Sequence, residues 1–89
     1  MRKDIKRTIT GMLELPKEIV YNLPLISVTG NESMEIENYK GVIEYTEEKI
    51  RVSTTSGTLR IEGRKLLLKQ ITAESISVTG KIVRFEFIQ

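Results

Sequence analysis

The chain has 89 residues and a formal net charge of +2, and it contains no His, Cys or Trp. This length suits one domain, and the lack of Cys excludes both a disulfide framework and a thiolate metal site. The lack of His removes the side chain that most often acts as a general acid or base near neutral pH. No apolar run approaches the roughly 18 residues of a membrane span, and none of signal-peptide length follows the basic N-terminus.

The N-terminal part, residues 1–23, is predicted to be a helical lead-in to the domain. Ile5 and Ile9 recur at helical spacing among four basic side chains, which indicates an amphipathic helix over residues 2–13. Such a helix either packs on the rest of the domain or lies on an anionic membrane surface. Residues 1–13 are therefore a candidate peripheral membrane contact.

Two prolines mark the passage from helix to strand. Pro16 suits the first position of a second short helix over 16–22, because its missing N–H costs nothing there. Pro24 prevents continuation of that helix and biases Leu23 towards extended geometry. We therefore expect β structure to begin at residue 25.

Residues 25–89 are predicted to form an antiparallel β-meander within the same single domain, 1–89. Short runs rich in Ile, Val and Thr alternate with Gly, Asn, Ser and Glu turn signals. The seven or eight expected strands are 25–29, 33–37, 42–46, 49–55, 58–62, 65–71, 74–79 and 82–88. Closure as a sandwich and closure as a rolled sheet both stay open, and the regular strand spacing makes a β-solenoid the alternative architecture.

The alternation of apolar and polar residues predicts which side chains share a face. A two-residue loop at Glu47-Glu48 places Tyr45 opposite Ile50 and Ile43 opposite Val52. A second loop, at Ser56-Gly57, places Val52 opposite Ile61. All of these residues are expected on one buried face.

Later in the chain, Gly63-Arg64 and Gly80-Lys81 are predicted to be further two-residue hairpin loops. The alternation breaks at residues 67–76, which predicts a bulge near Lys69-Gln70 or a strand passing from one sheet to another. In the last strand, Phe85 and Phe87 share an apolar face, and we expect both, together with Tyr45, in the core.

The carboxylates show no catalytic pattern. Glu47-Glu48 reads as a polar hairpin loop, and Glu35 and Glu37 read as a solvated strand face, although a site for a hard cation there is conceivable. No nucleophile motif and no phosphate-binding glycine loop is present. We assign no catalytic, cofactor-binding or metal-binding residue. The nearly neutral body of the chain does not suggest a nucleic-acid binder.

The order of the motifs is similar to that of the YabP/YqfC family of sporulation proteins, and most similar to its YqfC branch. The motifs are LPKEIV at 15–20, LP at 23–24, ISVTG at 26–30, IENYKG at 36–41, GTLRIEG at 57–63 and ISVTGKI at 76–82. The resemblance implies a non-enzymatic protein of endospore-forming Firmicutes that is made in the mother cell and acts in spore envelope development. It also implies a membrane protein encoded alongside as the partner, and a cytoplasmic location that extends to the surface of the outer forespore membrane.

Two functions are weighed. The first is a structural or assembly module that binds a protein partner, or another copy of itself, through its sheet edges. Its candidate partner contacts are Ile5, Ile9, Tyr39 and Lys40. The alternative is a small-ligand or carbohydrate-binding β domain, whose hydrogen-bonding groups would come from Tyr39, Ser53, Thr55 and Thr58 around a concave pocket.

Overall fold

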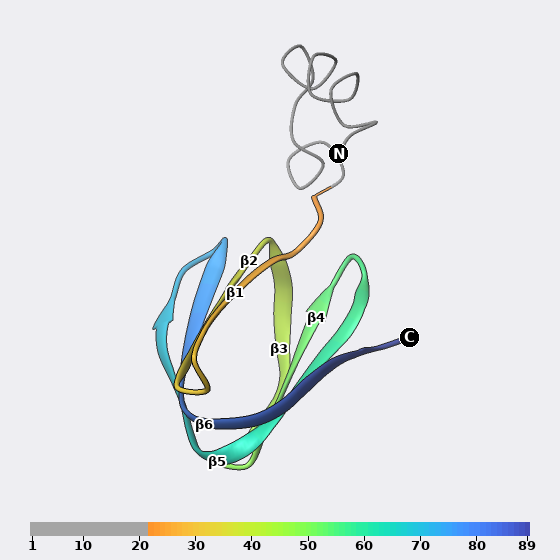
Figure 1. Cartoon of the computed structure of the whole chain (residues 1–89). Helices are drawn as coiled ribbons and strands as arrows, with labels where there is room; N and C mark the ends of the chain where they lie inside the picture. The colour runs from red at the N-terminus through yellow and green to blue at the C-terminus, as the bar shows by residue number, and fades with distance from the viewer. Residues whose placement is uncertain (1–21) are drawn as a thin grey trace, which may run out of the picture.

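The computed structural model describes residues 22–89, which form a single six-stranded antiparallel sheet with no helix (Figure 1). The strands are β1 (Leu25–Thr29), β2 (Ser33–Glu37), β3 (Tyr39–Tyr45), β4 (Lys49–Thr54), β5 (Gly57–Ile71) and β6 (Ser75–Ile88). Their order across the sheet is β1-β2-β6-β5-β4-β3. The all-β prediction is confirmed. The helices predicted over 2–13 and 16–22 fall outside the described residues, apart from Asn22.

Two of the predicted hairpin loops do not form, and the sheet therefore has six strands rather than seven or eight. The chain runs through Gly63-Arg64 inside β5 and through Gly80-Lys81 inside β6, with shifts of register at this level. A Cβ at Gly63 would lie 2.0 Å from the Lys81 carbonyl oxygen, and one at Gly80 would lie 2.5 Å from the carbonyl oxygen of Lys65. Both glycines thus permit the close approach of two long strands instead of making turns.

The sheet is not a simple meander, because β2 pairs with β6 and not with β3. β2 and β3 occupy the second and sixth places in the sheet, yet Asn38 alone joins them. Four strand spacings measure about 19 Å in a flat sheet, whereas two Cα–Cα steps reach at most about 7.6 Å. The sheet must therefore curl, as Figure 1 shows. The antiparallel pairing also makes the β-solenoid alternative wrong.

Asn38 forms the corner of this curl. Its φ of 65° lies in the left-handed region, which Asn adopts more readily than most residues. Its backbone N–H donates to the Glu74 carbonyl oxygen at 2.7 Å, and its side-chain Nδ2 donates to the Leu23 carbonyl oxygen at 2.9 Å. The corner is thus tied both to the β5–β6 turn and to the segment that enters β1.

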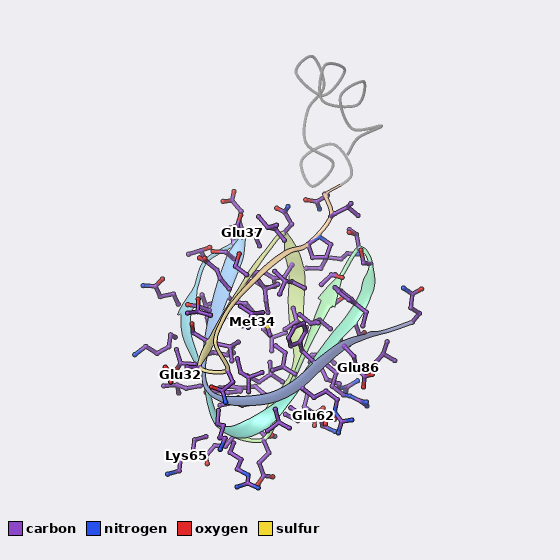
Figure 2. All side chains as sticks on the ribbon, in the orientation of Figure 1. Glu32, Met34, Glu37, Glu62, Lys65 and Glu86 are labelled. Atoms are coloured by element: carbon purple, nitrogen blue, oxygen red, sulfur yellow. The ribbon has the colours of Figure 1, made fainter. Side chains whose placement is uncertain are left out.

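The core lies inside the curl and draws on both halves of the long β5–β6 hairpin. Figure 2 shows the Met34 side chain inside the curl, with Glu62 and Glu86 on the outside. The buried apolar residues are Met34, Ile36, Ile50, Val52, Leu59, Ile61, Leu66, Ile76, Val78 and Ile82. Each buries an aliphatic side chain worth about 1.5–3 kcal/mol of transfer free energy, so closing the curl supplies the main stabilising contribution.

The predicted buried face holds for Ile50, Val52 and Ile61 but not for Ile43, and two predicted registers are wrong. Val52 lies opposite Leu59 rather than Ile61, because the turn uses Thr55 and Ser56. This changes the partner by two residues, which leaves every side chain on its face. Ile43 is not opposite Val52, since β3 is irregular between Val42 and Glu44 and leaves Ile43 50% exposed.

Other sequence predictions are met. Tyr45 lies opposite Ile50 as expected. A register shift between Leu68 and Gln70 confirms the irregularity predicted near Lys69-Gln70.

Three aromatic side chains were expected in the core and are only half-buried. Phe85 lies opposite Ile61 and Phe87 opposite Leu59, so both rings do belong to the core face. They are nevertheless 43% and 41% exposed, and Tyr45 is 45% exposed. The reason is their place at the border of the sheet: within residues 22–89 no strand lies beyond β3 or beyond the C-terminal half of β6.

Replacing Gly80 by Ala tests the close approach of β5 and β6. The new methyl would meet the Lys65 carbonyl oxygen at a φ of 129°, which L-residues rarely adopt. We expect a loss of about 2–4 kcal/mol in unfolding free energy by urea titration. Gly41→Ala is the matched control, since nothing lies within 4 Å of its Cβ position. Equal losses in the two variants would contradict this role for Gly80.

Truncation of the two residues of one cross-strand pair should cost different amounts of unfolding free energy. Ile61→Ala removes a fully buried side chain and should cost about 2–5 kcal/mol. Phe85→Ala removes a half-exposed ring from the same row and should cost about half as much. Urea unfolding of dilute protein measures both, and a larger loss for Phe85→Ala would show that its ring is covered.

Candidate functional site

The charged side chains on the outer face of the sheet are engaged with one another. Arg51 Nε lies 2.7 Å from Glu44 Oε1. Glu62 contacts Arg84 Nε at 3.1 Å and Arg60 Nε at 3.2 Å, and Arg60 also pairs with Glu86. Each such exposed pair contributes only about 0.2–1 kcal/mol. These carboxylates therefore help to set strand register, and none sits in the low-dielectric pocket that a general acid or base requires.

Glu44 shows the electrostatic effect of this pairing. The hydrogen bond from Arg51 lowers the pKa of the Glu44 carboxyl below its ordinary value, and the positive charge of Lys49 at 3.7 Å acts in the same direction. The side chain is ionised at neutral pH and accepts a charge-assisted hydrogen bond. This shift describes a structural ion pair rather than a group prepared for proton transfer.

The cation site that Glu35 and Glu37 suggested gains no support. The two residues line a recess of about 350 Å³ together with Asn22, Asn38, Glu74 and Ser75. Over residues 22–89, no group of three or more metal-ligating side chains converges. A hard cation such as calcium needs six or more oxygen ligands.

Two of the four hydroxyl groups that suggested a sugar or small-ligand site make hydrogen bonds within the domain instead. The Tyr39 hydroxyl donates to the Thr72 carbonyl oxygen at 2.6 Å, and the Thr55 hydroxyl donates to the Asn22 carbonyl oxygen at 2.9 Å. Neither residue lines the recesses of about 320–380 Å³ that are formed by described residues near Glu48, Glu37, Lys81 and Tyr45. Ser53 and Thr58 do not line them either. The concave pocket with convergent hydroxyl groups is not found there.

The four predicted partner contacts differ in where they lie and in whether the structure describes them. Tyr39 is half-buried against the core and hydrogen-bonded, so its ring and hydroxyl are both used inside the domain. Lys40 is exposed on β3, which is a border strand of the sheet. Ile5 and Ile9 lie outside the described residues. The structure thus describes only two of the four residues, and of these two Lys40 keeps the more exposed side chain.

A further exposed apolar surface of the described residues lies on the C-terminal half of β6. We call residues 83–88 the β6 edge. Residues 75–79 of β6 pair with β2, but the β6 edge has β5 on one side and no strand on the other among residues 22–89. Its exposed apolar side chains are Val83 (65%), Phe85 (43%), Phe87 (41%) and Ile88 (37%). An uncovered strand edge is a template for another strand.

Sequence reasoning missed this edge because it placed β6 within a meander. The alternation of Val83, Phe85 and Phe87 with Arg84 and Glu86 was visible, and it indicated a strand with one apolar face. Which strand lies at a border depends on pairing between distant segments, and the alternation carries no information about that order.

Comparisons with known proteins give one family. A model of the YabP family matches residues 23–89. The chain is also 28% identical over 85 residues to the "Uncharacterized protein YqfC" of Bacillus subtilis (strain 168), an alignment that covers 96% of this chain and 91% of that protein. No solved structure matches the chain. In the part of the chain described here, no helix is long and apolar enough to cross a membrane.

The ion pair of Glu44 can be tested by titration. Arg51→Gln removes the hydrogen bond that contributes most to the lowered pKa, so we expect the pKa of Glu44 to rise towards its ordinary value. Lys49→Gln should raise it less, since the lysine acts through a longer contact. NMR titration of the Glu44 side-chain carbonyl measures both, and an unchanged pKa in Arg51→Gln would contradict the assignment.

The same pair predicts a pH dependence. A carboxyl whose pKa is lowered in the folded state adds stability above its unfolded pKa, and this is lost as the pH falls through the folded pKa. Arg51→Gln should therefore reduce the acid sensitivity of unfolding.

Proposed function

The chain belongs to the YabP family, whose members are sporulation proteins, and we propose that it is a non-enzymatic assembly module of spore envelope development. It acts in the mother cell through protein–protein contacts. The observation that carries the proposal is the combination of this family membership with a domain that leaves strand edges uncovered among residues 22–89.

The geometry supports a binding role for the borders of the sheet. β1 and β3 each have a partner strand on one side only, and so does the β6 edge. An extended segment of a partner can add to such a strand through main-chain hydrogen bonds, while alternate side chains supply specificity. Curling of the sheet keeps these borders short and distinct, so they can serve different partners.

The partner we propose is a membrane protein encoded alongside this chain. Lys40 on β3 is an accessible charge at a border strand and is suited to contact it. The basic residues 1–13, with Ile5 and Ile9 at helical spacing, provide a second contact, either with that protein or with the anionic surface of the outer forespore membrane. The protein would then act at the membrane surface from the mother-cell cytoplasm.

A non-enzymatic role agrees with the state of the ionisable groups. On the outer face of the sheet, Glu44, Glu62 and Glu86 are each held by an arginine. The hydroxyl groups of Tyr39 and Thr55 donate hydrogen bonds to main-chain carbonyl groups. These side chains stabilise the domain and leave recognition to its edges.

Deleting the gene in its spore-forming host tests the proposal. We expect fewer heat-resistant spores and an altered envelope in electron micrographs, because an assembly component is missing. The wild-type gene supplied in trans should restore both. Normal spore yield, envelope and germination in the deletion strain would refute the assignment.

Two matched variants sharpen this experiment. Lys40→Glu reverses the accessible charge on β3 and should complement the deletion poorly. Glu48→Lys reverses an exposed charge in the β3–β4 turn and should complement fully. Equal complementation by both would argue against a partner contact at β3, and the folded state of each variant is checked by circular dichroism.

A further inference from the structure

Among residues 22–89, the β6 edge is a regular uncovered border apart from Val83, which lies at a register shift with β5. From Arg84 to Ile88 its register with β5 is uninterrupted. β3 by contrast is irregular at two places, and the outer part of β5 shifts register between Leu68 and Gln70. Bulges of this kind hinder edge-to-edge pairing. β1 is regular but carries no charged residue that could specify a register.

Two rows of charged side chains cross the outer face and end at the β6 edge. The first row runs in register through Glu44 on β3, Arg51 on β4, Arg60 on β5 and Glu86 on β6. The second runs through Lys49 on β4, Glu62 on β5 and Arg84 on β6. One row thus presents a carboxylate at the border and the neighbouring row presents a guanidinium. Their side chains are 42% and 62% exposed.

We propose that two copies of this chain pair antiparallel through their β6 edges, about a two-fold axis at Phe85. In this register Arg84 of each copy lies opposite Glu86 of the other. Each charge row then continues across the junction into the complementary row of the second copy, with Arg60 and Glu86 followed by the second copy's Arg84 and Glu62. A two-fold axis requires such a self-complementary pattern.

The apolar face fits the same register. Phe85 lies opposite its own counterpart, and Val83 lies opposite Phe87 of the second copy. These are three of the four exposed apolar side chains of the β6 edge, and Phe85 and Phe87 border the buried core through Ile61 and Leu59. Cross-strand aromatic pairs stabilise antiparallel sheets. Pairing therefore covers the uncovered rings and satisfies the free backbone groups together.

Neighbouring registers are disfavoured by charge. An axis at Arg84 would place the two guanidinium groups opposite each other, and an axis at Glu86 would do the same for two carboxylates. Like charges directly opposite on adjacent strands are destabilising. The charge pattern hence selects Phe85 as the centre.

A mixing experiment with two charge-reversal variants tests this register. In a dimer of Arg84→Glu, both junction pairs become Glu opposite Glu. In a dimer of Glu86→Arg, both become Arg opposite Arg. In the mixed dimer both pairs are again of opposite charge, while the contacts within each chain are the same as in the separate variants. Any loss of folding stability therefore cancels in the comparison.

Sedimentation equilibrium of the full chain measures the association constants. We expect the wild-type protein to dimerise and each variant alone to associate at least about tenfold more weakly. In the mixture, the mixed dimer should regain an association constant close to that of the wild type. The differences should shrink with added salt. Lys69→Glu and Glu47→Arg change net charge by the same amounts away from the β6 edge and should dimerise like the wild type.

Three results would overturn the proposal. One is a wild-type protein that stays monomeric at every concentration, including the case in which residues 1–21 cover the β6 edge and protect its amides from exchange. Another is a dimer that both variants leave unchanged. The third is a mixture whose association constant is no larger than those of the two variants measured separately. The self-pairing rests on the proposed assembly role. It is measured on purified protein, whereas the assembly role is tested by the spore phenotype, so either one can fail without the other.

Discussion

The fold depends on the sharp curl of one sheet, which two backbone features impose. At Gly63 and Gly80 the two longest strands approach so closely that neither position has room for a side chain. At Asn38 a single residue joins strands that a flat sheet would hold about 19 Å apart. The hairpin of β5 and β6 therefore bends, and its two halves face each other across the ten buried aliphatic residues of the core.

The curl also determines where recognition can occur. Aliphatic side chains fill the inside, and the charges of the outer face pair along two rows. What remains accessible is the set of strand borders, with half-exposed rings at Tyr45, Phe85 and Phe87. A small domain that binds through its borders needs no pocket and no reactive side chain. That property connects the fold to the assembly role proposed for this member of the YabP family.

The local sequence pattern predicted much of the secondary structure. It failed for features that depend on the pairing of distant segments. Alternation placed Ile50, Val52 and Ile61 correctly on the inner face, since a shift of two residues preserves the face. The same reasoning took Gly63 and Gly80 for turn residues, because a glycine at a turn and a glycine at a close strand contact look alike in sequence. The family was identified from the order of its motifs. The uncovered β6 edge could not be identified from the sequence, since strand order arises from long-range pairing.

The curl itself is tested most directly by methyl NOE measurements on the protein in solution. The structure predicts NOEs between methyl groups of the two facing halves, from Met34 and Ile76 on one side to Ile50 and Leu59 on the other. If NOEs appeared only within each half, with none between them, the sheet would be extended. The shared core, and the borders that follow from it, would then be contradicted.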